Sequence, residues 1–248
     1  MKPKRSDPLW LFDLDNTLHN ASHAIFPAIT QNMNRFMADL LGDGVTPADA
    51  ATVNAARALY WQRYGATLLG LVKHHGVRAD SFLHAAHSFD NLTAMIRAER
   101  GLARLLRRLP GRKILLTNAP RDYSREVIRH LGLHRHFAAH IPIEAMRVHG
   151  HLRPKPSTQY LRKLVAKQKV RAADCILIED TVSNLRAAKR IGMRTALITR
   201  YLQANQSHQV HSQQGNVLHQ YKIKKSYACV DVAVKSVLDL PQHIHRLR

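Results

Sequence analysis

The sequence predicts an α/β fold, in which a doubly wound parallel sheet carries a helical domain inserted after its first strand. Short apolar runs of strand length alternate with helix-patterned stretches, and this alternation is typical of a parallel sheet flanked by helices. Between the first two apolar runs, residues 21–99 show helical periodicity instead. The length of 248 residues suits one core of this kind together with a smaller insert.

The first strand is predicted over residues 9–14, where apolar residues follow one another as in a strand buried on both faces. The insert follows over residues 21–99, where apolar residues recur at three- and four-residue spacing. Within it, Thr46 is expected to be the N-cap of a helix whose first position is Pro47. The other helices of the insert are expected over about 25–40, 68–75 and 81–87.

Residues 1–20 and 100–248 are predicted to form the core. Ser157 stands where one core helix should begin, and Gly132 and Gly192 stand where two others should end. The Gln- and His-rich segment 203–226 is predicted to be a mobile loop. The remaining strands are expected over 113–118, 139–143, 175–180, 195–199 and 228–234, and the core helices over 100–109, 123–131, 158–167 and 183–191.

The charge of the chain is strongly positive, with 38 Lys and Arg against 17 Asp and Glu. Residues 181–230 contain no acidic side chain at all. Such a field steers small anionic substrates towards a protein and also attracts nucleic acid without sequence preference. The spacing of a zinc finger and the aromatic motifs of RNA-binding domains are absent from the sequence, so we expect a small phosphorylated substrate to be the main partner.

The cysteine content and the hydropathy pattern suit a cytoplasmic protein. Cys175 and Cys229 are the two cysteines, and Cys175 lies in an apolar strand pattern that favours a buried free thiol. No apolar run approaches the ~18 residues of a membrane helix, so no membrane partner is expected.

Polar side chains end three of the predicted strands. Parallel strands have their carboxyl ends at one edge of the sheet, where ligands of such folds bind. Four carboxylates brought together there repel one another, and Mg²⁺, which prefers oxygen ligands, would neutralise them. Lys155, in a Pro-flanked turn before a helix, would attract an anionic substrate. The strand-end residues are Asp13, Asp15, Thr117, Asn118, Glu179 and Asp180.

The order of these residues resembles the haloacid dehalogenase (HAD) superfamily of phosphatases, whose core is Rossmann-like. Asp13–Thr17 is similar to the first motif, Thr117 to the second, Lys155 to the third and 179–184 to the fourth. The fourth motif departs from many relatives, with Glu179 in place of Asp and Thr in place of Ser two positions later. Both changes keep the charge or the hydroxyl group.

The resemblance implies a mechanism. Asp13 would be the nucleophile that forms an aspartyl-phosphate, and Asp15 the general acid and base. Mg²⁺ would be held by the Asp13 side chain, the Asp15 backbone carbonyl and Asp180, with Glu179 either as an additional ligand or directly behind the ligands. The phosphate would be bound by Thr117, Asn118 and Lys155, and among these Thr117 and Lys155 would stabilise charge on the transferred group.

A narrower resemblance, over about residues 9–202, is to the pyrimidine 5′-nucleotidase group of HAD subfamily I, in which the helical insert is a cap. It rests on the cap run Arg63–Leu71 and on three core motifs, residues 13–18, 117–120 and 153–156. It implies a pyrimidine nucleoside 5′-monophosphate such as UMP or CMP as substrate. Tyr64 would stack on the base and Thr67 would bind the base edge or ribose, unless both only pack the cap. A sugar phosphate or phosphoglycolate substrate, and a basic nucleic-acid-binding protein, are the alternatives.

Overall fold

The computed structural model of the chain describes residues 7–202 and 228–247. These residues pack as two compact units. One unit, an α/β core, contains 7–22, 96–202 and 228–247. The other, a helical unit, contains His23–Met95, which lies within the stretch 21–99 predicted as the insert. The segment 203–226, predicted as a loop, lies outside the described residues.

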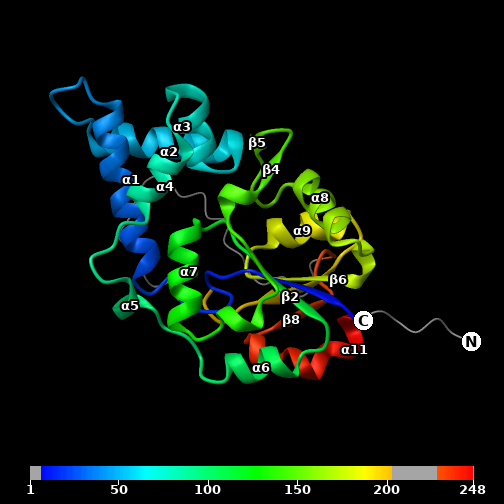
Figure 1. Cartoon of the computed structure of the whole chain (residues 1–248). Helices are drawn as coiled ribbons and strands as arrows, with labels where there is room; N and C mark the ends of the chain where they lie inside the picture. The colour runs from blue at the N-terminus through cyan, green and yellow to red at the C-terminus, as the bar shows by residue number, and fades with distance from the viewer. Residues whose placement is uncertain (1–6, 203–227, 248) are drawn as a thin grey trace, which may run out of the picture. The chain divides into compact units, whose positions relative to one another are not determined.

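The core unit is built on a six-stranded sheet with the strand order β3-β2-β1-β6-β7-β8 (Figure 1). All of its strand pairs are parallel, so the predicted doubly wound sheet is confirmed. After β1 the chain builds the sheet outwards on one side and then returns to the other side, so β1 lies at the point where the strand order reverses. The strands span Leu9–Phe12 (β1), Arg112–Leu116 (β2), Ala139–Ile141 (β3), Cys175–Glu179 (β6), Arg194–Ile198 (β7) and Val232–Val234 (β8).

Apolar residues cover both faces of β1, which explains the unbroken apolar run in the sequence. Leu9 and Leu11 belong to the cluster that packs under α8 and α9 on one side of the sheet. Phe12, on the other face, meets Phe137 with ring centroids 6.1 Å apart. Burying the central strand on both faces fixes its register, and so fixes the position of the residue that follows it.

The core helices begin and end close to the predicted positions. Ser157 caps α8, because its side chain accepts a hydrogen bond from the Tyr160 N–H at 3.2 Å. Gly132 and Gly192 have φ of +68° and +87°, the left-handed conformation that follows a helix end. Cys175 and Cys229 are buried free thiols, as expected. The helices span Leu102–Arg108 (α6), Arg121–His130 (α7), Thr158–Gln168 (α8), Val182–Arg190 (α9) and Ile244–Leu247 (α11), and a short hairpin joins Arg147–Val148 (β4) to His151–Leu152 (β5).

The predicted start of the second helix of the helical unit was wrong. The helix begins at Ala50, and its N-cap is Asp49, whose carboxylate accepts from the Thr52 N–H at 2.7 Å. Thr46 instead lies in a turn that the Asp43 carboxylate holds by accepting its N–H at 2.6 Å. A carboxylate is a strong N-cap, so it decides between nearby candidates. The helices of this unit span Ile25–Leu41 (α1), Ala50–Tyr64 (α2), Thr67–His75 (α3), Ala79–Ala86 (α4) and Leu92–Met95 (α5).

None of the helices within residues 7–202 and 228–247 is both long enough and apolar enough to cross a membrane.

Gly70 lets α3 approach α2 closely. A Cβ atom built on Gly70 would lie 2.2 Å from Cγ of the Tyr60 ring. We therefore expect Gly70→Ala to destabilise the helical unit by about 1–3 kcal/mol, the usual cost of overpacking. Hydrogen exchange of the α2 and α3 amides measures this. Val72→Ala, at a side chain of the same helix that is 40% exposed, is the control and should change exchange little. Unchanged protection in Gly70→Ala would contradict the close packing.

Candidate active site

Asp13 lies directly beyond the central strand β1, in a buried position. Its N–H donates to the Ile178 carbonyl oxygen at 3.0 Å, so the pairing of β1 with β6 extends one residue past the strand. The Asp13 side chain is 5% exposed. One of its oxygens, Oδ2, accepts a hydrogen bond from the Thr17 hydroxyl at 3.2 Å. The end of the central strand thus places a carboxylate at the edge of the sheet, at the point where the strand order reverses.

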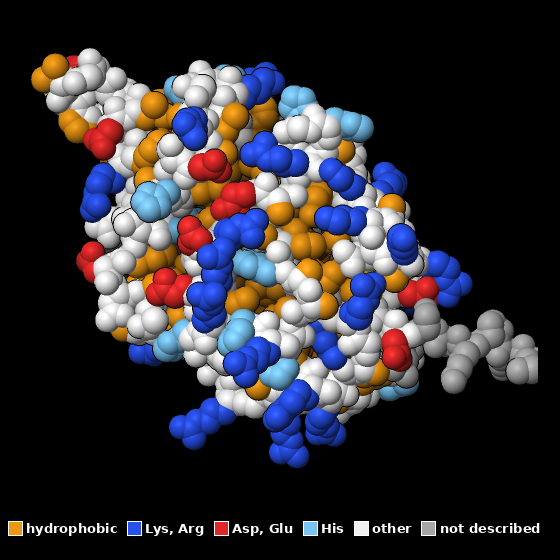
Figure 2. Space-filling view, in the orientation of Figure 1, with side chains coloured by type: hydrophobic (Ala, Val, Ile, Leu, Met, Phe, Trp, Pro, Cys, Tyr) orange, Lys and Arg blue, Asp and Glu red, His pale blue; other side chains and the backbone are white. Residues whose placement is uncertain are grey.

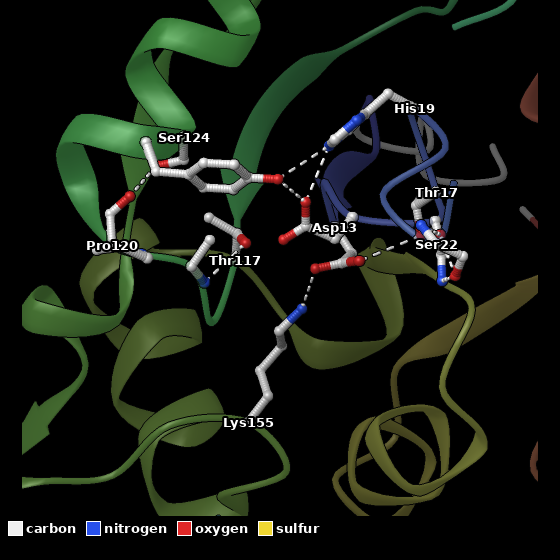
Figure 3. A network of polar contacts seen from close by, with 12 residues as sticks. Asp13, Thr17, His19, Ser22, Thr117, Pro120, Ser124 and Lys155 are labelled. Atoms are coloured by element: carbon white, nitrogen blue, oxygen red, sulfur yellow. Dashed lines mark hydrogen bonds and ion pairs between the residues drawn. The ribbon is translucent and has the colours of Figure 1, made fainter. Parts of the chain in front are cut away.

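Lys155 joins the ends of β1 and β6 by bonding to a carboxylate from each (Figure 3 shows its bond to Asp13). Its Nζ lies 2.6 Å from Asp13 Oδ1 and 2.7 Å from Glu179 Oε2. All three side chains are almost completely buried. Charge-assisted hydrogen bonds of this length, shielded from water, hold the two carboxylates in a defined arrangement.

Burial and neighbouring charges raise the pKa of two carboxyl groups of this cluster, those of Asp13 and Asp180. Burial, and then the charge of Glu179, raise the pKa of Asp13 to about 7 although Lys155 lowers it. Burial, followed by Glu179 and Asp13, raises the pKa of Asp180 well above its usual range. Burial alone would lower the pKa of Lys155, but Asp13 and Glu179 raise it above its usual value. The lysine therefore stays charged, while the raised pKa values of Asp13 and Asp180 mean that the folded protein resists ionisation of these two carboxyl groups.

Asp13, Glu179 and Asp180 form a group suited to a divalent cation. One oxygen from each carboxylate can be chosen so that all three lie within 4.8 Å of one another. The donor set is made only of oxygen atoms, which suits Mg²⁺ and other hard cations. The carboxylates therefore fit such a cation, which would also offset their mutual repulsion.

Asn118 holds the Lys155 turn in place through both ends of its amide. Its Nδ2 donates to the Lys155 carbonyl oxygen at 2.9 Å, and its Oδ1 accepts from the Lys155 N–H at 3.0 Å. The side chain thus positions the lysine backbone, a task that the sequence did not indicate. Thr117, at the end of β2, is 1% exposed, and its hydroxyl oxygen accepts from the Ala119 N–H at 3.0 Å.

Asp15 is held by two side chains that sequence reasoning missed. Its Oδ1 lies 2.8 Å from His19 Nε2 and accepts from the Tyr123 hydroxyl at 2.5 Å. Burial, and then the charge of Asp15, raise the pKa of Tyr123 well above its usual range, so the phenol stays protonated. Tyr123 lies in the first turn of α7, directly after the loop that follows Thr117. Its place just past a strand end was the signal that could have identified it.

Tyr64 and Thr67 belong to the helical unit, where both have partners or neighbours of their own. The Tyr64 hydroxyl lies 2.6 Å from His74 Nε2. Lys73 Nζ and Arg63 Cζ lie 5.3 Å and 5.8 Å from the centroid of the Tyr64 ring. Thr67 begins α3 and is 9% exposed. Tyr64 thus has contacts within the helical unit, and Thr67 is a buried residue of α3.

The parallel α/β sheet carries a buried cluster of carboxylates beyond its central strands. The chain belongs to the haloacid dehalogenase-like hydrolase family, whose model matches residues 9–192. The family typically uses a divalent metal ion, and the cluster of Asp13, Glu179 and Asp180 is present here.

Solved structures share this fold at low sequence identity. A HAD phosphatase from Thermococcus onnurineus is 14% identical, with 97% of this chain and 99% of that chain covered and a TM-score of 0.60. A 2-haloacid dehalogenase from Pseudomonas syringae pv. Tomato DC3000 is 18% identical, with 98% and 100% covered and a TM-score of 0.56. A putative phosphoglycolate phosphatase from Lactobacillus plantarum is 19% identical, with 96% and 99% covered and a TM-score of 0.53.

Proposed function

We propose that the protein is a Mg²⁺-dependent phosphomonoester hydrolase that works through an aspartyl-phosphate. The observation that carries this proposal is the buried Asp13, bonded to Lys155 and clustered with Glu179 and Asp180. A carboxylate held in this way can attack phosphorus to form an acyl phosphate, from which water later releases it as a carboxylate, so a difficult displacement is divided into two easier steps. Asp15, two residues after Asp13, supplies the general acid that such a reaction needs.

In the first step an oxygen of Asp13 forms a bond to phosphorus while the bond from phosphorus to the ester oxygen breaks. Asp15 gives its proton to the departing oxygen, which leaves as an alcohol. In the second step Asp15 takes a proton from water as the water oxygen bonds to phosphorus, and the Asp13–phosphorus bond breaks to release phosphate. Mg²⁺, held by Asp13, Glu179, Asp180 and the Asp15 carbonyl, supplies charge neutralisation when bound.

The other residues near the cluster orient the reacting groups. Lys155 fixes the Asp13 carboxylate at 2.6 Å and brings a positive charge for the phosphoryl oxygens. Asn118 keeps the Lys155 backbone in place, so its effect on the phosphate acts through the lysine. The Thr117 hydroxyl stands at the end of the neighbouring strand, where a phosphoryl oxygen would need a donor.

A dehalogenase is the second reaction that this fold suggests, since one of the similar structures is a 2-haloacid dehalogenase. A halide leaves carbon as a stable anion and needs no proton. Such a reaction would leave Asp15 and its two bonded partners without a task. It would also leave the carboxylates of Glu179 and Asp180 without one, whereas phosphoryl transfer uses all of them.

For the substrate we propose a pyrimidine nucleoside 5′-monophosphate, with the helical unit as the cap. The support is the run Arg63–Leu71 and the three core motifs that resemble the pyrimidine 5′-nucleotidase group. Within the helical unit, Arg63, Lys73 and His74 surround the Tyr64 ring. If Tyr64 contacts a base, it does so as part of this polar cluster rather than as an isolated ring.

A panel of phosphate esters tests the proposed function. With Mg²⁺ present we expect phosphate to be released faster from UMP and CMP than from AMP, GMP, phosphoglycolate or sugar phosphates. A preference for phosphoglycolate or a sugar phosphate would support the proposed phosphatase activity and contradict the proposed nucleotide substrate. Chloride release from 2-chloropropionate, with no phosphate released from any ester, would contradict the phosphatase activity and favour a dehalogenase.

The net charge of +21 also supports a weak, non-specific affinity for nucleic acid as a side property. On the face that Figure 2 shows, Lys and Arg side chains outnumber Asp and Glu. Binding of labelled RNA should fall steeply with salt and show no preference among sequences. Tight binding that survives high salt would favour nucleic acid as the main partner.

Magnesium is expected to stabilise the protein more at pH 8 than at pH 5. In the metal-free protein the pKa of Asp13 is about 7, above its usual value of about 4. A raised pKa means that the folded state resists ionisation of Asp13, so stability falls as the pH rises from about 4 to about 7. Mg²⁺ binds the ionised cluster and reverses this loss.

Thermal melts with and without Mg²⁺ at the two pH values measure the effect. Asp180→Asn removes one carboxylate of the cluster and should lose most of the Mg²⁺-induced shift in Tm. Asp122→Asn, at a side chain that is 92% exposed, should keep it. Equal shifts at pH 5 and pH 8 would contradict a site that contains Asp13.

A further inference from the structure

Two buried side chains converge on one oxygen of Asp15. His19 is completely buried, Tyr123 is 3% exposed, and both contact Oδ1 of the carboxyl group. The two partners lie 104 positions apart in the sequence. Packing them around a single oxygen fixes the plane of the carboxyl group as well as its position.

The loop after β1 places His19 in this arrangement. His19 follows Asp15 by four residues, and the two residues form a β-bridge. Asn16, with φ of +59°, is clamped to Ser22 by hydrogen bonds of 2.8 Å and 3.1 Å, so the loop is closed on itself. His19 Nδ1 is buried and has no hydrogen-bond partner among the described residues, which favours the tautomer with the ring proton on Nε2, facing Asp15.

Helix α7 places Tyr123. The next residue along the helix, Ser124, donates to the Pro120 carbonyl oxygen at 2.7 Å and also contacts His140. These bonds hold the first turn of α7 against the loop that follows β2 (Figure 3). The Tyr123 hydroxyl therefore reaches Asp15 from a rigid element rather than from a mobile loop.

Hydrogen bonding then decides which oxygen of Asp15 carries the transferable proton. An oxygen that already accepts from a phenol and an imidazole N–H is a poor place for a third proton. We propose that His19 and Tyr123 are positioning residues for the proposed phosphatase reaction, which select Oδ2 of Asp15 as the oxygen that exchanges the proton with the substrate. This proposal rests on the proposed function of Asp15.

The proton transfer balances in both steps. In the first, the Oδ2–H bond of Asp15 breaks and a new O–H bond forms on the leaving oxygen as its bond to phosphorus breaks. In the second, Oδ2 recovers a proton from the attacking water. His19 and Tyr123 keep their own protons throughout, because their bonds to Oδ1 serve to orient the carboxyl group.

The dependence of kcat/KM on the leaving group separates positioning of an acid from a merely structural role. A nitrophenolate leaves well without a proton, whereas an alkoxide or phenolate needs one. With Tyr123→Phe we expect kcat/KM to fall at least about 10-fold for UMP and phenyl phosphate and less than about 3-fold for 2,4-dinitrophenyl phosphate. His19→Leu should act in the same direction, and His19→Gln, which keeps an N–H donor, should restore part of the loss.

Two comparison variants define the scale. Asp15→Asn removes the acid itself and should show the steepest dependence on the leaving group. Ser124→Ala alters the adjacent residue of α7, whose bonds go to Pro120 and His140, and should affect all esters alike. Circular dichroism and Tm verify that each variant is folded, and Tyr123→Phe, which removes one oxygen atom, is the variant least able to disturb packing.

The outcomes separate the two proposals. A steeper dependence in Tyr123→Phe and His19→Leu supports positioning. An equal loss for all esters in these variants, with a steep dependence in Asp15→Asn, overturns positioning and leaves the phosphatase intact. A wild-type protein that releases phosphate from none of the esters overturns the proposed function and the positioning role together.

Discussion

Asp13→Asn is expected to lower kcat for phosphate release by about 10³-fold or more, with the protein still folded. An amide oxygen cannot form the acyl phosphate, so both steps of the reaction lose their shared intermediate. Because Asp13 lies at the end of the buried central strand, the change acts at the reacting atom and not through a shifted backbone. Phosphate release from UMP, measured with Mg²⁺ at saturating substrate, tests this.

The fold should persist because Asn has nearly the same shape and because the native carboxylate is costly to bury. Burial raises the pKa of Asp13 to about 7, which shows that the folded protein does not favour its charge. Lys155 keeps its second partner, Glu179, at 2.7 Å in the variant. We therefore expect the Tm in the absence of metal to be unchanged or higher, whereas the loss of activity is nearly complete.

A matched control comes from Asp122, which is 92% exposed in α7. Asp122→Asn makes the same chemical change on the surface and should leave both kcat and Tm as they are. Retained phosphatase activity in Asp13→Asn would contradict the assignment of Asp13 as nucleophile. A parallel loss of activity and of fold would leave the two effects unseparated, so near-UV circular dichroism accompanies each assay.

Strand ends were the part of the site that the sequence could predict. Asp13 and Glu179 each follow an apolar run, and parallel strands bring such ends to one edge of the sheet. Lys155 could be predicted as a site residue because its turn is flanked by prolines and leads directly into a helix. These three residues meet as one buried cluster.

Side-chain hydrogen bonds between distant elements could not be predicted from the sequence in this way. Asn118 looked like a phosphate-binding residue, yet both ends of its amide bond the backbone of Lys155. The bond from Tyr123 to Asp15 joins residues more than a hundred positions apart, and no periodicity encodes it. The start of α2 depended on a choice between two caps, Thr46 and Asp49, and local hydrogen bonds decided it. The apolar pattern specifies layers, whereas such pairings depend on the packed geometry.

Lys155→Met should be the most destabilising change in the site. Met matches the length of the lysine chain but leaves Asp13 and Glu179 buried without the cation between them. Breaking a buried ion pair by removing one partner costs about 3–5 kcal/mol. Phosphate release should fall by about 10²-fold or more as well, since a positive group aimed at the transferred phosphate is lost.

Urea unfolding without metal at pH 7 and at pH 5 measures how much free energy of unfolding Lys155→Met loses at each pH. Removing Lys155 removes the interaction that lowers the pKa of Asp13, so this pKa rises further in the variant. The carboxyl group is then protonated at pH 5, repulsion from Glu179 is relieved, and the loss of stability should be smaller than at pH 7. Mg²⁺ at pH 7 should recover part of the loss, because it supplies the missing positive charge.

Lys163→Met provides the comparison. Lys163 is exposed on the neighbouring helix α8, and its Nζ bonds only to a backbone carbonyl oxygen, that of Arg147, at 2.8 Å. Its replacement should change the free energy of unfolding by no more than about 0.5 kcal/mol. A loss in Lys155→Met that is the same at both pH values and indifferent to Mg²⁺ would mean that the lysine acts through packing of its stem. A loss of unfolding free energy that is smaller at pH 5 and with Mg²⁺ would show that the positive charge of Lys155 offsets the repulsion between the carboxylates of the site.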